Sequence, residues 1–490
     1  MKHLPACLFA CACLSATLRA DLPKPTLAPT VRSVDLKIGE AAEVTLADGK
    51  RATVKLLDLK EKVDSMAAAV REAKVRVEVN GQQAWLTSAN YNLPQMVGGV
   101  QVDCPITRGY NANSGEDSWG LEKDARLRFW PAGAPWIEPG KFLYPLKQRW
   151  FATMTQFSNE PTYVDGGDKP DRKKIYYHND LDFGGCEALV EVVAATDALV
   201  VSVSNKTLEG YSLTPVRPRY DVVYLLDERG WYYRYSHLHT IDPAIQSGAR
   251  VKMGQRIGLL GKEGASGGWT HLHFGIKARQ PSGKWGTEEA YAFAWEAYVR
   301  ERRPEVIAVA RPHHFIRAGE SIELDASKSW AASGKITGYD WTFTDGTKAA
   351  GPKVRRSYSK PGSYSETVKV TDDAGHVAYD FAIVQVIGDD LVNIPPAIHP
   401  SFYPTTGLKP GDSVTFKVRT FRDQGGETWD FGDGTEKVAV KSDGNANALA
   451  KDGYAVTQHT FARAGDYIIR VEHVNERGEH AIAHLWVRVE

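Results

Sequence analysis

Residues 270–276 of this chain read Thr-His-Leu-His-Phe-Gly-Ile, and their alternation predicts a β-strand. Leu272 and Phe274 would share one face, as is typical of a strand seated on a hydrophobic core. His271 and His273 would share the other face, about 7 Å apart along the strand. Two imidazoles at that spacing can converge on one ion or one substrate.

Two further segments carry side chains that suit a metal site. They are His178-Asn179-Asp180-Leu181-Asp182 and Tyr235-Ser236-His237-Leu238-His239. His178 and Asp182 are an even number of positions apart, so an extended segment presents both on one side. Three nitrogen or oxygen ligands with an open fourth position are typical of a catalytic zinc, whereas a structural zinc is usually enclosed by cysteines. The chain has few cysteines and no His-Glu-x-x-His motif, so the pattern favours a catalytic zinc on a β-sheet.

The order of these motifs resembles that of a known family. His-x-x-x-Asp comes first, Tyr-x-His-Leu follows, and a glycine-rich run, Val-Lys-Met-Gly-Gln-Arg-Ile-Gly, leads into His-Leu-His-Phe. This arrangement, over roughly residues 170–278, resembles the lysostaphin-type (Gly-Gly endopeptidase) zinc metallopeptidases. The resemblance implies a small antiparallel β-fold with a groove, and cleavage of peptides in bacterial peptidoglycan.

The resemblance also implies a role for each of five residues. His178, Asp182 and His273 would bind one zinc ion per chain. His237 and His271 would lie beside the metal as base and transition-state stabiliser, and the sequence does not decide which does which. Zinc lowers the pKa of a bound water to about 7, and histidine titrates in the same range, so the two functions are compatible.

Two positions depart from the family pattern. Asp180 stands where the family usually has glycine, and Asp197-Ala198 stands where an Asp-Gly turn is common. Neither departure touches the five matched positions. The Asp180 change leaves the local backbone and the groove entrance undetermined.

The last third of the chain contains an internal repeat. Trp341-Thr-Phe-Thr-Asp-Gly-Thr returns as Trp429-Asp-Phe-Gly-Asp-Gly-Thr, and each copy continues into a tyrosine-containing strand. The pattern resembles polycystic kidney disease (PKD) domains, which are immunoglobulin-like sandwiches. Both tryptophans are expected in the cores rather than as sugar platforms. The second copy is about 15 residues longer, and residues 441–452 are expected to form its surface loop.

The fold class predicted from these patterns is an all-β multidomain protein. An antiparallel β-sheet metallopeptidase domain would be flanked by an N-terminal β-rich domain and two C-terminal immunoglobulin-like β-sandwiches. The expected boundaries are 1–20 for a signal peptide, 21–145 for the β-rich domain, 146–303 for the peptidase, and 304–388 and 389–490 for the two PKD-like domains. Two helices are also expected, a candidate at 62–74 and a closing amphipathic helix over 287–301 with a threonine cap.

Composition and the N-terminus indicate an exported protein. The 490 residues include 60 basic and 60 acidic side chains, so no net positive charge favours nucleic acid. Residues 1–20 resemble a secretory signal, with a lipoprotein signal at Cys11 as the weaker alternative. No later apolar run is long enough to span a membrane. We therefore expect a secreted, periplasmic or cell-envelope associated bacterial protein, in which Cys104 and Cys186 remain and could form a disulfide.

The function predicted from the sequence is zinc-dependent endopeptidase activity on peptidoglycan stem peptides or cross-bridges, through a metal-activated water. One alternative is a non-catalytic peptidoglycan-binding regulator, although the complete ligand set favours an enzyme. Another is a peptidase that acts on extracellular Gly-rich proteins. The PKD-like pair either contacts polysaccharide or protein or only separates domains, and the sequence leaves these alternatives open.

Overall fold

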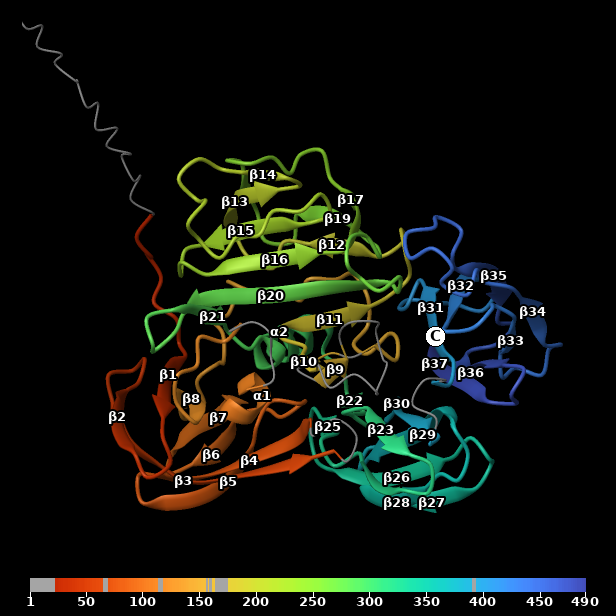
Figure 1. Ribbon diagram of the computed structural model, residues 1–490, viewed down its shortest axis with the longest axis horizontal. Coiled ribbons are helices and arrows are strands. Elements are labelled where there is room, and N and C mark those ends of the chain that lie inside the picture. Colours follow the sequence, from red (N-terminus) through yellow and green to blue (C-terminus); the bar gives the residue numbers. More distant parts are fainter. Residues whose placement is uncertain are drawn as a thin grey trace, which may run out of the picture.

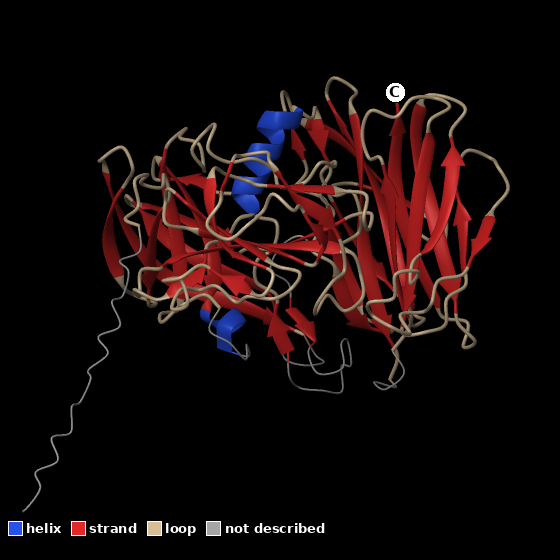
Figure 2. Cartoon of the chain, turned by 90° about the horizontal axis from the view of Figure 1, so that it is seen from above, coloured by secondary structure: helices blue, strands red, loops and turns tan. Residues whose placement is uncertain are grey.

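The computed structural model describes residues 23–64, 69–112, 118–155, 157, 161–163, 175–389 and 394–490. The fold is nearly all β, and its sheets are mainly antiparallel, so the predicted fold class is confirmed. The N-terminal strands, the central histidine-rich sheet and the two sandwiches pack against one another (Figures 1 and 2). The predicted signal peptide lies outside the described residues. Within them, no helix is both long enough and apolar enough to cross a membrane.

The N-terminal region consists of two sheets that share one hydrophobic core. The first sheet has the order β1 (Arg32–Leu36), β8 (Ala125–Pro131), β7 (Val100–Thr107) and β6 (Gln95–Val97). The second has the order β2 (Ala41–Thr45), β3 (Arg51–Val63), β4 (Val70–Val79) and β5 (Gln82–Thr87), and a short helix, α1 (Arg108–Ala112), follows β7. The prediction of a helix over 62–74 is wrong, because β3 ends within this segment at Val63 and β4 begins within it at Val70. Alternating burial of Val75, Val77 and Val79 seats β4 on the core.

The central sheet carries the histidine-rich segments. Its order is β11 (Leu181–Gly184), β20 (His271–Arg279), β16 (Tyr232–Ser236), β15 (Val223–Asp227), β13 (Ala198–Val203) and β14 (Lys206–Thr207), with β18 (Arg250–Val251) on β13 and β21 (Trp285–Thr287) on β20. A smaller sheet has the order β12 (Glu191–Val193), β19 (Arg256–Leu260) and β17 (Leu238–Ile241), and β9 (Pro161–Tyr163) pairs with β10 (Ile175–Tyr177). The long strand β20 crosses the centre of the molecule (Figure 1). As predicted, its Leu272 and Phe274 belong to the domain core, and Ile276 on the same face does too.

A helix closes this domain near the predicted place. It is α2 (Tyr291–Arg302), and its aromatic residues Phe293 and Trp295 belong to the same core as Phe274 of β20. The predicted threonine cap is wrong. Thr287 pairs with β20 as the last residue of β21, and the helix starts after Ala290, which makes no side-chain cap hydrogen bond.

The two repeats form neighbouring sandwiches. The first contains β22 (Val306–Ile307), β23 (His314–Arg317), β24 (Ser321–Asp325), β25 (Trp330–Ala331), β26 (Ile336–Thr342), β27 (Lys348–Ala350), β28 (Lys353–Ser357), β29 (Gly362–Asp372) and β30 (Val377–Ile387). The second contains β31 (Ala397–Tyr403), β32 (Ser413–Phe421), β33 (Glu427–Asp430), β34 (Val438–Val440), β35 (Ala455–Thr460), β36 (Gly465–Val474) and β37 (His480–Val489). A short parallel pairing between β29 and β37 joins them edge to edge. Trp341 and Trp429 are buried in the two cores, as predicted.

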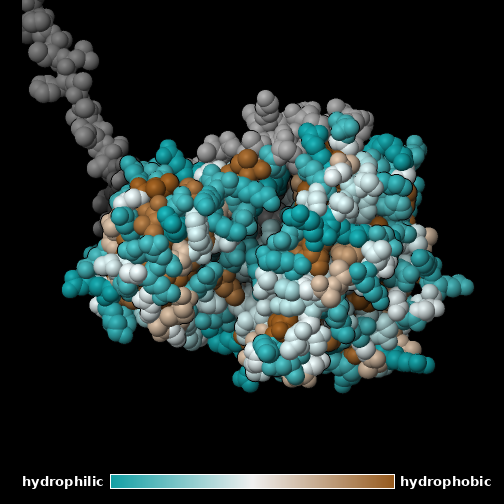
Figure 3. Space-filling model, turned by 90° about the horizontal axis from the view of Figure 1, so that it is seen from below, coloured by the Kyte–Doolittle hydropathy of each residue, from teal (hydrophilic) through white to brown (hydrophobic). Residues whose placement is uncertain are grey.

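The two cysteines beyond the predicted signal do not form a disulfide. Cys104 lies in β7 and Cys186 follows β11, and both are buried as free thiols. On the outside, the face shown in Figure 3 is mainly hydrophilic, with hydrophobic residues in small separate patches. Isolated patches of this kind are normal for a protein surface.

Candidate metal and catalytic site

The pairing of β11 with β20 places the first candidate ligands side by side. In the antiparallel register Asp182 lies opposite His273, and Gly184 lies opposite His271. His273 also faces Ser236 of β16 on its other side, so β20 is held between two strands at this point. Because the opposite face of β20 is anchored in the core, both histidines are directed to one point of the sheet.

Three donor atoms meet at this point. Nε2 of His178, Oδ1 of Asp182 and Nδ1 of His273 lie 3.0, 3.0 and 3.2 Å from one another. All three side chains are buried. Ligands held tetrahedrally at the usual zinc distances of roughly 2.0–2.1 Å would be roughly 3.3 Å apart, so the triangle matches the donor spacing of a zinc site. The chemistry of the set, two imidazoles and one carboxylate, also fits zinc.

His178 reaches this triangle by a different route from the one predicted. The sequence argument treated 178–182 as extended, but β11 begins only at Leu181, and Asp180 has a φ of +76°. The chain therefore turns at Asp180 before it enters the strand. The two ligands converge because of this turn and not because of strand alternation.

Asp180, the departure from the family pattern, lies behind one of the candidate ligands. Its Oδ2 is 3.3 Å from Nε2 of His273, and its Oδ1 is 3.4 Å from Nζ of Lys277. Since Nδ1 of His273 faces the other two donors, Nε2 can carry the ring proton and donate it to Asp180, which fixes the tautomer. Burial opposes ionisation of Asp180, but the positive charge of Lys277 and the contact with His273 hold its pKa below the usual range.

The room for this carboxylate is provided by Gly275. A Cβ at Gly275 would lie 2.3 Å from Oδ2 of Asp180, which is closer than carbon and oxygen can approach. The carboxylate of Asp180 therefore occupies the space that a side chain at position 275 of β20 would need. Sequence reasoning noticed Asp180 only as an irregularity, because nothing local in the sequence links it to a residue on β20.

The two remaining histidines lie beside the triangle. The rings of His237 and His271 are 4.6 Å apart between centroids, and Nε2 of His271 is 3.6 Å from Oδ2 of Asp182. Nδ1 of His237 is 2.6 Å from the carbonyl oxygen of Glu263, and Nδ1 of His271 is 3.1 Å from that of Trp269. A carbonyl oxygen only accepts, so in both rings Nδ1 carries the proton and Nε2 is the acceptor.

Local structure sets the electrostatics of these two rings. His237 has a φ of +67° at the break between β16 and β17, and its main-chain N–H donates to Asp221, which a paired Arg219 holds in place. Burial lowers the pKa of His237 although Asp221 opposes the shift, and burial lowers the pKa of His271 well below its usual value. Both imidazoles are therefore held in the neutral form, which can accept a proton.

The site also contains groups that the sequence analysis missed. Arg219 and Asp221 support His237, and the indole of Trp269 stacks on His271 with 3.8 Å between ring centroids. Asp221 is buried and comes just before the buried strand β15. A single carboxylate at the start of a buried strand is the signal that could have marked it.

Comparisons with known proteins add three matches to family models. Residues 176–284 match Peptidase family M23, and residues 302–386 and 400–485 each match a PKD domain. A curated relative, collagenase ColA from Clostridium perfringens (strain 13 / Type A), is 30% identical over 87 residues, which make up 18% of this chain and 8% of that protein. This chain thus spans a small part of the relative's length.

Solved structures show only distant likeness. Helicobacter pylori Csd3 is 16% identical, with 47% of this chain and 56% of that chain covered and a TM-score of 0.21. Fibronectin(III)-like modules of Clostridium thermocellum CbhA are 12% identical, with 38% of this chain and 94% of that chain covered and a TM-score of 0.15. Similarity at this level supports no conclusion about function.

Proposed function

Since residues 176–284 form a peptidase family M23 domain and two PKD domains follow it, as the motifs predicted, we propose that this protein is a zinc-dependent endopeptidase. Its proposed substrates are stem peptides or cross-bridges of bacterial peptidoglycan. The observation that carries the proposal is the meeting of His178, Asp182 and His273 beside two imidazoles whose Nε2 atoms can accept protons.

The residues of the chain divide the chemistry between them. His178, Asp182 and His273 would hold a zinc ion, which when bound acidifies water and polarises a carbonyl group. Neutral His237 and His271 can each take a proton at Nε2, and the imidazolium so formed can donate it to a leaving amine or to a developing oxyanion. The carbonyls of Glu263 and Trp269 keep Nδ1 protonated, so each ring presents Nε2 throughout.

The site is suited to this role because its parts are fixed before substrate arrives. Asp182 and His273 are cross-strand neighbours, and Asp180 holds the far nitrogen of His273. A carboxylate behind a metal-binding histidine typically contributes 10–100-fold to metal affinity or activity. The proposed location in the bacterial envelope agrees with the PKD domains, which are typical of extracellular proteins.

The test combines metal analysis with digestion of purified murein. The protein should bind about one zinc per chain and release new amino termini from murein, detected by mass analysis of the fragments. Asp182→Ala should lose zinc, whereas Asp197→Ala, which removes a partly exposed carboxylate of the same domain, should keep it. His271→Ala should keep zinc and lose roughly 10²–10⁴-fold in turnover. A fully active His271→Ala variant would contradict the assigned chemistry.

The same experiment distinguishes the alternatives. Zinc binding without new amino termini from any peptide would favour a non-catalytic regulator. Cleavage of a Gly-rich extracellular protein but not of murein would redirect the proposal to that substrate class. Collagen is a suitable second substrate, because 87 residues of this chain resemble a protein named a collagenase.

A further inference from the structure

The insertion of the second PKD domain is a largely exposed surface loop, as predicted, but it also contacts the peptidase domain. Residues 441–452 distinguish this copy from the first, and Asn445 within them contacts the peptidase loop over residues 266–270. That loop leads directly into His271 at the start of β20. The extra segment therefore contacts a stretch of the peptidase domain that is adjacent to a proposed catalytic histidine.

A fully buried arginine joins the insertion to the loop. Arg419 of β32 binds both carboxylate oxygens of Asp443, at 2.8 and 2.7 Å, and donates to the carbonyl of Asn447 at 2.7 Å. Its remaining nitrogen, Nη1, donates to the carbonyl oxygen of Gly268 in the peptidase domain. The hydrogen bonds to Asp443 and Asn447 of its own domain fix the guanidinium. Nη1 is therefore a rigidly placed donor to the carbonyl of Gly268.

Asn445 fits the loop as closely as Arg419 does. Its amide nitrogen donates to the carbonyl of Gly267 at 3.1 Å. Its Oδ1 occupies the place that a side chain at position 268 would need, because a Cβ there would lie 2.1 Å away. Gly268 also has a φ of +89°, so its conformation and its neighbour both require glycine.

A third contact ends on the residue before His271. The main-chain N–H of Thr270 donates to the hydroxyl of Tyr454 at 2.9 Å, and that hydroxyl contacts Nδ1 of His399 at 2.9 Å. Nε2 of His399 is 3.0 Å from the hydroxyl of Thr155, which belongs to the peptidase domain. Tyr454 and His399 are buried. A polar chain thus runs from the peptidase domain through the second PKD domain and back to Thr270.

The loop passes this constraint to the catalytic ring. Trp269 stacks its indole on His271, and its carbonyl oxygen accepts from Nδ1 of the same imidazole. Both contacts depend on the main chain of residues 268–270, which Arg419 and Tyr454 hold from the other domain. We propose that the second PKD domain positions the catalytic imidazole of His271, with Arg419, Asn445 and Tyr454 as the positioning residues.

The inference rests on the proposed function, since His271 is catalytic only if the protein is a peptidase. It gives the second PKD domain a task other than binding a wall polymer or spacing domains. In the first PKD domain the segment that corresponds to the insertion is absent. The two copies are therefore expected to differ in their effect on catalysis.

The experiment compares variants of the full chain. Tyr454→Phe removes the hydroxyl that accepts from Thr270, and Asn445→Ala removes the contact with Gly267. Leu449→Ala is the matched control, because this side chain lies in the same insertion but is exposed. A displaced catalytic group can cost up to about 100-fold in rate. We expect kcat to fall about 10-fold or more for Tyr454→Phe, with KM and zinc affinity little changed.

Hydrogen–deuterium exchange of residues 264–271 provides a readout that does not need turnover. Exchange should accelerate in Tyr454→Phe and Asn445→Ala but not in Leu449→Ala. If the natural protein cleaves peptides and Tyr454→Phe keeps full kcat, the positioning role is wrong while the proposed function stands. If no peptide is cleaved but exchange accelerates as expected, the proposed function fails while the clamp on the loop stands. Unchanged exchange in both variants would refute the clamp itself.

Discussion

Two of the junctions that connect the peptidase domain to its neighbours are each built on a fully buried arginine that binds a carboxylate. At the N-terminal junction Arg128 of β8 binds both oxygens of Asp103, at 2.9 and 2.6 Å. At the C-terminal junction Arg419 binds both oxygens of Asp443 in the same manner. Both guanidiniums are almost completely removed from solvent. The two junctions therefore begin from the same local arrangement.

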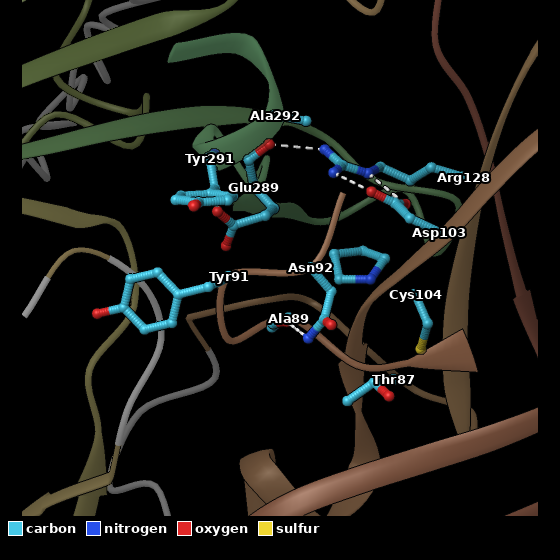
Figure 4. A pocket seen from close by; sticks show the side chains of 11 residues that line it. Thr87, Ala89, Tyr91, Asn92, Asp103, Cys104, Arg128, Glu289, Tyr291 and Ala292 are labelled. Atoms are coloured by element: carbon cyan, nitrogen blue, oxygen red, sulfur yellow. Dashed lines mark hydrogen bonds and ion pairs between the residues drawn. The ribbon is translucent and has the colours of Figure 1, made fainter. Parts of the chain in front are cut away.

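The two junctions differ in the groups to which Nη1 of each arginine donates. Nη1 of Arg128 donates to a carboxylate oxygen of Glu288 at 2.8 Å. It also donates to the carbonyl of Glu289 at 2.6 Å, and Figure 4 shows Arg128 beside Glu289, just before α2. Nη1 of Arg419 donates to the carbonyl of Gly268, three residues before His271. The first junction thus pairs charged side chains of two domains. The second fixes the main chain at Gly268, beside the proposed catalytic site. The same interaction serves stability in one place and positioning in the other.

The largest expected effect comes from removing the charge at the N-terminal junction. Arg128→Met leaves Asp103 and Glu288 buried without their cation, so the free energy of unfolding should fall by about 3–5 kcal/mol. Arg108→Met is the control, because Arg108 is largely exposed and lies 3.8 Å from Asp124, so its loss should change stability by less than about 1 kcal/mol. Urea denaturation measures both. Equal, small losses would show that the buried network contributes little.

The same junction should also respond to pH. Burial raises the pKa of Glu289 to about 7, although Arg128 opposes the shift, while Asp103 and Asp180 reinforce it. A raised carboxyl pKa means that the folded state binds the proton more tightly than the unfolded state. This stabilisation is complete below about pH 4.5 and declines as the pH rises through about 7.

Glu289→Gln removes this titration while keeping the polar side chain. The free energy of unfolding of the natural protein should therefore fall between pH 5 and pH 8. This fall should exceed that of the variant by up to about 3 kcal/mol. Urea denaturation of both proteins at the two pH values provides the measurement. Peptidase activity per folded molecule should stay unchanged, since Glu289 lies on the small cavity lined by Tyr91 and Cys104 rather than on the metal site. An identical pH dependence in both proteins would show that Glu289 titrates normally.

At the C-terminal junction a single methyl group should affect catalysis as well as stability. Gly268 and Gly248 have nearly the same φ, +89° and +87°, but only Gly268 faces Asn445 at 2.1 Å. Alanine at either position costs about 1–2 kcal/mol for the left-handed conformation. Gly268→Ala should in addition displace the loop and lower kcat about 10-fold or more, whereas Gly248→Ala should keep kcat. Equal kcat values in the two variants would show that the conformation of this loop does not influence catalysis.

The contrast between the junctions also explains what the sequence could predict. The alternation in β20 is a local pattern, so the strand could be anticipated, whereas the meeting of His178, Asp182 and His273 is implied by the resemblance of the motif order to a known family. The helix expected at 62–74 failed because pairing between β3 and β4 outweighs local helix propensity. The contact of Tyr454 with Thr270 joins residues 184 positions apart, and no local pattern reports such a contact.

The smallest expected effect uses the two thiols, because each lies at one junction. Cys104 lines the N-terminal cavity with Arg128, whereas Cys186 interacts with Ser401 and Lys417 of the second PKD domain. Burial raises their pKa values to about 12 and about 11, so alkylation near neutral pH requires a local opening that exposes the thiol.

Tyr454→Phe should therefore increase the alkylation rate of Cys186 several-fold and leave that of Cys104 unchanged, because losing one hydrogen bond costs about 1 kcal/mol. Arg128→Met should produce the opposite pattern. Peptide mapping after timed exposure to iodoacetamide measures both rates in one sample. If the alkylation rates of both thiols rise together in either variant, the junctions open as one cooperative unit and the distinction between them does not hold. If each variant affects only its own thiol, the two junctions are energetically separate, and catalysis can be tuned at one without loss of stability at the other.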